Sequence, residues 1–156
     1  MKLRGWAAVL VFVCASIPLA IAQSDLRTTS GDQYVPQLGD IMNSAQTRHI
    51  KLWFAGKAQN WDLARFELSQ LRANLTEAAL LYSGIPVSNV TTLGAPLQSL
   101  SDAIDTKDGK RFATSFGDLT GGCNACHGTM ARGFIVIRTP TEQPFGDQVF
   151  APQGKR

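Results

Sequence analysis

The sequence predicts an all-α protein, namely an antiparallel up-down-up-down four-helix bundle followed by an extended C-terminal tail. Apolar residues recur at alternating spacings of three and four in four separate segments, which is the period of a helix with one buried face. Glycine, proline and asparagine residues separate these segments, and no convincing strand alternation is present. Because the connections between the segments are fairly short, consecutive helices should lie antiparallel.

Residues 1–22 have the features of a secretory signal peptide. Lys2 and Arg4 precede an apolar run over residues 6–19, and an Ala-Ile-Ala cleavage site ends at Ala22. The run is too short and wrongly flanked for a membrane span, so we expect an exported chain with no stable membrane anchor. Cys14 would be removed with this segment.

Composition indicates one exported domain and no nucleic-acid partner. Cleavage after Ala22 would leave 134 of the 156 residues, enough for a single core. The whole chain has 15 basic and 12 acidic residues, so loss of Lys2 and Arg4 leaves a formal charge of +1. A nearly neutral chain of this kind lacks the excess of basic residues that is typical of nucleic-acid-binding proteins.

The first two helices follow a polar, flexible leader over residues 23–34. The first helix should begin near Pro36, with apolar positions as far as Gly56. Asn60 is a favourable N-cap for the second helix, which should run to about Tyr82 before Ser-Gly-Ile-Pro ends it. The expected buried face of the first helix comprises Leu38, Ile41, Met42, Ala45, His49, Leu52, Trp53 and Gly56.

The remaining helices complete a bundle domain over residues 35–156. Residues 87–94 are interpreted as a loop, and Pro96 suits the first turn of a third, shorter helix with Leu97, Leu100 and Ile104 on one face. A fourth helix should follow Asp108-Gly109, with apolar positions at Phe112, Phe116, Leu119, Cys123, Cys126 and Met130. The β-branched run after Gly133 and three later prolines predict an extended tail packed back over the bundle.

The fourth helix contains the pentapeptide Cys123-Asn124-Ala125-Cys126-His127, which matches the Cys-x-x-Cys-His pattern of covalent c-type haem attachment. Cysteines three positions apart lie about one helical turn from each other, so both thiols can add to the two vinyl groups of one porphyrin. The adjacent imidazole is then placed to ligate the iron as the proximal ligand. The motif therefore predicts one covalent haem c.

Other interpretations of the motif explain fewer of its residues. A disulfide or a thioredoxin-type redox pair would not require His127 and would be expected in a βαβ setting. A structural zinc site needs two more Cys or His ligands, whereas only Cys14 and His49 remain. Haem attachment also agrees with export, since in bacteria it takes place outside the cytoplasm, and we expect the protein in the periplasm.

A haem motif near the C-terminus of a four-helix pattern resembles the class II cytochromes c, the cytochrome c′ type. The resemblance covers about 115 residues. It implies the bundle fold, electron transfer or gas binding, and a homodimer as a possible assembly. Cytochromes c′ usually have an arginine four residues after the ligand histidine, but here position 131 is Ala and Arg132 follows. The stretches that carry the resemblance are 38–42, 49–56, 60–61, 119–127 and 133–137 with Pro140.

Met42 is the predicted sixth iron ligand. In an antiparallel bundle the early part of the first helix lies beside the late part of the fourth, which favours Met42 as the residue opposite His127. By resemblance, low-spin class II cytochromes also take a methionine from this part of the first helix. His49, about 10 Å further along the axis, is the rival, and an empty or water-filled site is the third possibility. Met130 is too close to His127 on the same helix to reach the other face of the iron.

Phe116 and Leu119, one to two turns before Cys123, are predicted to pack against the haem. The expected function is single-electron transfer between redox partner proteins, because a Met/His-ligated haem in a buried pocket has a raised reduction potential. We predict no enzymatic activity, since no acid/base constellation is visible. If Met42 does not ligate, the alternative is a five-coordinate protein that binds NO or CO; a peroxidase-type enzyme would need His49 as its distal base.

Overall fold

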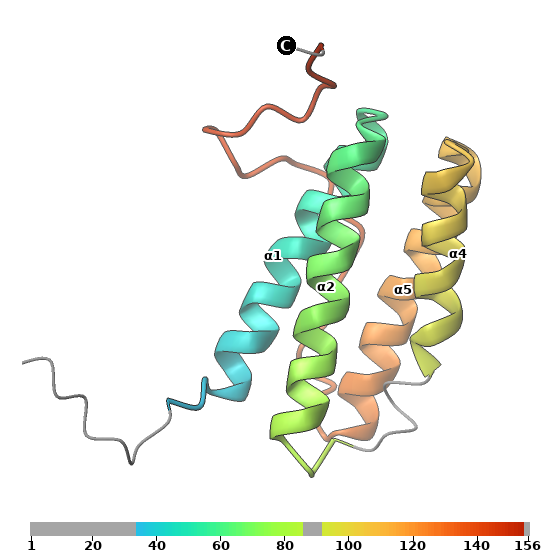
Figure 1. Cartoon of the computed structure of the whole chain (residues 1–156). Helices are drawn as coiled ribbons and strands as arrows, with labels where there is room; N and C mark the ends of the chain where they lie inside the picture. The colour runs from blue at the N-terminus through green and yellow to red at the C-terminus, as the bar shows by residue number, and fades with distance from the viewer. Residues whose placement is uncertain (1–33, 86–91, 155–156) are drawn as a thin grey trace, which may run out of the picture. The chain divides into compact units, whose positions relative to one another are not determined.

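The computed structural model describes residues 34–85 and 92–154. Within these ranges the chain contains four helices and no strand, consistent with a four-helix bundle (Figure 1), which confirms the predicted all-α class. The predicted signal peptide with Cys14, and the predicted leader except for Tyr34, lie outside the described residues. The description below concerns the unit Val35–Arg156. Its helices are α1 (Leu38–Lys57), α2 (Trp61–Leu81), α4 (Gly94–Asp105) and α5 (Gly109–Thr129).

Side-chain caps define the beginnings of two helices. The Asn60 side chain accepts a hydrogen bond from the Leu63 N–H at 3.2 Å, which confirms Asn60 as the N-cap of α2. Asp108 accepts from the N–H groups of Lys110 and Arg111 at 3.0 and 2.9 Å and caps α5. Gly94, which the sequence analysis assigned to a loop, is the first residue of α4. Residues 86–91 of that predicted loop lie outside the described part of the chain.

Three helices end in the same way, with a non-glycine residue in the left-handed conformation. Gln59, Lys107 and Ala131 have φ angles of 56°, 56° and 54°. Beyond each, a backbone N–H bonds the carbonyl five residues earlier, in the pattern of a Schellman motif. The chain therefore turns sharply after α1, α4 and α5. These bonds are Asn60 to Ala55 (2.9 Å), Asp108 to Ala103 (2.8 Å) and Arg132 to His127 (2.7 Å).

The core forms where the apolar faces of the helices meet. In Figure 1, α2 lies beside α1, and α4 lies beside α5. The predicted face of the third helix is confirmed, because Leu97, Leu100 and Ile104 are all buried. Glu67 on α2 is also buried, and Arg48 of α1 pairs with its carboxylate at 3.2 Å.

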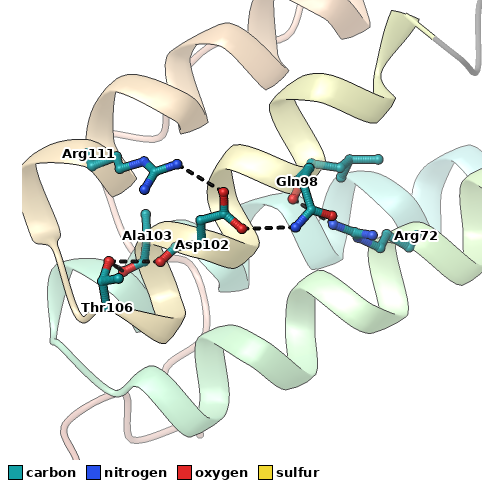
Figure 2. A network of polar contacts seen from close by, with 7 residues as sticks. Arg72, Gln98, Asp102, Ala103, Thr106 and Arg111 are labelled. Carbon is teal, nitrogen blue, oxygen red and sulfur yellow. Dashed lines mark hydrogen bonds and ion pairs between the residues drawn. The ribbon is translucent and has the colours of Figure 1, made fainter.

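Polar contacts also link α4 to α2 and to α5 (Figure 2). Asp102 of α4 accepts hydrogen bonds from Arg111 of α5 at 3.0 Å and from Gln98, one turn earlier, at 2.9 Å. Arg72 of α2 donates to the Leu97 carbonyl of α4 at 2.7 Å. These contacts supplement the apolar packing of α4 against its neighbours.

Residues 130–154 follow α5 without regular secondary structure. Phe150 is buried, with its ring centroid 5.9 Å from that of Phe54 and 6.4 Å from that of Phe145. The cap residue Asn60 also donates to the Phe150 carbonyl at 3.2 Å. None of the helices in the described ranges is both long and apolar enough to cross a bilayer.

Candidate functional site

A cavity of about 590 Å³ lies between α1, α2, α5 and the segment that follows α5. This volume is in the range of sites that hold a cofactor or another small molecule. Four residues selected from the sequence line this one cavity: Met42 of α1 and Cys123, Cys126 and His127 of α5. Most of the rest of the lining is apolar: Leu38, Ala45, Leu71, Leu75, Ala78, Ile85, Leu93, Met130, Ile135 and Ile137.

The two thiols of the motif lie three residues apart, about one helical turn, and both face the cavity from α5. Both Cys123 and Cys126 are partly buried and line the cavity. Burial, with a smaller contribution from the neighbouring Cys126, raises the pKa of Cys123 to about 11. Cys123 is therefore a neutral thiol at neutral pH, which disfavours the thiolate chemistry of a redox-active Cys-x-x-Cys pair.

The His127 ring is held by a backbone carbonyl from the segment that follows α5. Its Nδ1 lies 2.8 Å from the carbonyl oxygen of Ile135. A carbonyl can only accept a hydrogen bond, so Nδ1 carries the proton and Nε2 of the neutral ring has a free lone pair. Metal-bound histidines are commonly oriented by such a bond at the second ring nitrogen. A main-chain acceptor has no residue-type signature, and only its position in space reveals it.

The end of α5 brings that carbonyl into place. The left-handed residue Ala131 turns the chain, and the Ile135 N–H donates to the Arg132 carbonyl at 2.8 Å in a second turn. Ile135 thereby comes to lie beside the last turn of the helix from which His127 projects. Arg132 also lines the cavity.

His49 lines the same cavity as Met42 but is already tied to α5. Thr120 donates its hydroxyl hydrogen to the Phe116 carbonyl at 2.8 Å, so in the 2.9 Å contact with His49 Nε2 it must accept. His49 is 3% exposed, and burial lowers its pKa to about 4. Its Nδ1 is a buried acceptor without a hydrogen-bond partner among the described residues. Met42 is less buried than His49, and its thioether is not engaged in a hydrogen bond of this kind among the described residues.

The predicted haem-packing residues Phe116 and Leu119 are fully buried, but they belong to the core and do not contribute to the cavity lining. The Phe116 ring centroid lies 4.4 Å from that of His49. Phe116 therefore packs against His49, a residue of the cavity lining. Leu93 was not selected from the sequence; it enters the lining beside Gly122, where a Cβ would lie 2.5 Å from its Cδ2.

In the described part of the chain, no three His, Cys, Asp or Glu side chains are grouped so that they could hold a metal ion by themselves. Comparison of the chain with protein-family models, with curated proteins and with solved structures gave no match.

Proposed function

We propose that this chain is a monohaem c-type cytochrome of the class II kind, exported to the periplasm, that passes single electrons between redox partner proteins. Cys123 and Cys126 would hold the haem covalently, His127 would be the proximal ligand and Met42 the sixth ligand. The bound haem would supply the iron that changes oxidation state. The protein would act as an electron carrier and not as an enzyme.

The observation that carries the proposal is the hydrogen bond between His127 Nδ1 and the Ile135 carbonyl. In the neutral ring this bond leaves the Nε2 lone pair free, and the cavity is also lined by the two thiols of the attachment motif and by a methionine from another helix. The residues present fit a haem in two further respects. The lining is mainly apolar, as a macrocycle requires, and a porphyrin supplies four nitrogen ligands itself, so the chain has to provide axial ligands only.

Met42 is favoured over His49 by its position on α1, because His49 lies seven residues, about 10 Å, further along the helix from the end expected to face His127. The proposal also includes the up-down-up-down order of the helices and a tail that closes the site. Support comes from the connections over residues 58–60 and 106–108, since three-residue connections favour antiparallel neighbours. A Met/His-ligated, water-poor site raises the reduction potential, because a neutral thioether favours ferrous iron.

The decisive experiment is the absorption spectrum of the purified oxidised and reduced protein, with and without CO. We expect a low-spin spectrum with a near-infrared sulfur-to-iron charge-transfer band and no response to CO. Met42→Ala should abolish that band and open the site to CO. Met130→Ala is the matched control, since Met130 lines the same cavity from the helix of His127 and should leave the band unchanged.

Other spectra would refute parts of the proposal. A high-spin wild-type spectrum that shifts with CO would replace electron transfer by binding of NO or CO at a five-coordinate iron. A low-spin spectrum without the sulfur band, lost in His49→Ala, would assign the sixth position to His49. Absence of covalent haem after export through a competent attachment pathway would refute the proposal altogether.

A further inference from the structure

Asn124, between the two cysteines, is bonded to the segment that follows α5. Its Nδ2 donates to the Ile137 carbonyl at 2.8 Å, and its Oδ1 accepts from the Ile137 N–H at 2.8 Å. One side-chain amide thus satisfies both backbone groups of one residue, as a neighbouring strand would. The next residue of the motif, Ala125, is exposed and has no side chain that could do this.

This pair of bonds matters because burial does little to hold the segment. Phe134 is 79% exposed, Ile135 42% and Val136 73%. A segment with few buried apolar contacts opens easily unless other interactions hold it. Here the 132–135 turn holds one end and the Asn124 amide holds the other. Between them lies the Ile135 carbonyl, the acceptor for His127 Nδ1.

We propose that Asn124 is a positioning residue for the haem ligand: it holds residues 135–137 so that the Ile135 carbonyl fixes the orientation and tautomer of His127. This inference rests on the proposed function, in which His127 ligates the iron. It gives the two central positions of the motif different roles. Position 124 requires a side chain with both a donor and an acceptor, whereas position 125 does not.

The test compares Asn124→Leu with Ala125→Leu in the full-length, haem-loaded protein. Asn124→Leu removes both hydrogen bonds, while Ala125→Leu places the same side chain one residue later, on the exposed side. NMR hydrogen exchange in D₂O follows the Ile137 amide and the His127 Nδ1–H, and voltammetry gives the reduction potential. In Asn124→Leu we expect both protons to exchange at least tenfold faster and the potential to rise. The potential should rise because a weaker bond at Nδ1 makes the imidazole a poorer donor to the iron.

Ala125→Leu should match the wild type in all three measurements. Asn124→Asp keeps the acceptor for the Ile137 N–H but sets a carboxylate against the Ile137 carbonyl. It should show intermediate exchange, and it serves as the test if the leucine variant does not accumulate. The inference is overturned if Asn124→Leu frees the Ile137 amide while the His127 proton and the potential stay as in the wild type. It is also overturned if Ala125→Leu has the same effects.

Failure of the proposed function would look different. In that case the wild type would carry no covalent haem, whereas Ile137 amide exchange would still report on the bonds to Asn124.

Discussion

Substitution of Gly56 by alanine should destabilise the protein, although alanine is the better helix former. Gly56 lies in the last turn of α1, and a Cβ built there would be 2.2 Å from two atoms of the Phe112 ring and 2.7 Å from a third. Phe112 is 1% exposed, with the rings of Trp53, Trp61 and Phe116 at centroid distances of 6.3, 6.0 and 6.1 Å. The ring therefore has little room to retreat.

The magnitude follows from two opposing effects. Alanine in a helix interior is worth about 1 kcal/mol more than glycine. Overpacking of a filled core costs about 1–3 kcal/mol and occasionally more. Since an approach of 2.2 Å is far inside van der Waals contact, we expect the upper part of that range and a net loss of about 2 kcal/mol. Gly117→Ala on α5, where no atom lies within 4 Å of the added Cβ, should instead gain up to about 1 kcal/mol.

The assay is urea denaturation of the purified protein followed by far-UV circular dichroism, with the free energy of unfolding extrapolated to water. Phe112→Leu tests whether the cost comes from the Phe112 ring, because the smaller leucine side chain leaves room for the added Cβ. In the Phe112→Leu background, Gly56→Ala should cost at least 1 kcal/mol less than in the wild type, as a coupling of about that size is typical of residues in contact. Unchanged or increased stability of Gly56→Ala, or no coupling to Phe112, would refute the reasoning.

Three further predictions concern other sites. Arg48→Leu should lower the free energy of unfolding by about 2 kcal/mol, because it leaves the buried Glu67 carboxylate without its cation. Glu67→Gln should lower it by less, since it removes the buried charge. Thermal unfolding compares the two variants, and equal losses of stability would argue against this account. His49 should stay neutral in the folded protein down to about pH 4, whereas a histidine of the unfolded chain protonates near pH 6.5. The contribution of neutral His49 to stability is therefore complete above pH 6.5 and declines as the pH falls toward 4. An NMR titration of the ring with a midpoint near pH 6.5 would contradict this. Ala131→Gly should add about 1 kcal/mol in urea denaturation, because glycine adopts the left-handed φ of 54° without the Cβ penalty; a loss of stability would show that the turn after α5 does not carry this strain.

The sequence by itself determined the elements that depend on local patterns. The apolar period and the cap residue Asn60 act within a few residues along the chain, so the predicted starts of the helices agree with the observed ones to within about two residues. Gly94 was misassigned because its helix starts without a side-chain cap. The Cys-x-x-Cys-His spacing allowed a haem site to be proposed for the same reason, since the pattern lies within one turn of helix.

Only the tertiary structure decided what surrounds that motif. The Ile135 carbonyl and the two backbone groups of Ile137 have no signature in residue types, because every residue carries the same main chain. Helical period placed Phe116 on the right face but could not tell the core from the wall of a cavity, which depends on how neighbouring helices pack. A glutamate is usually exposed, and the burial of Glu67 is explained only by its ion pair with Arg48 of another helix. Periodicity specifies which side of a helix is buried, whereas the contacts made there depend on segments far away in the chain.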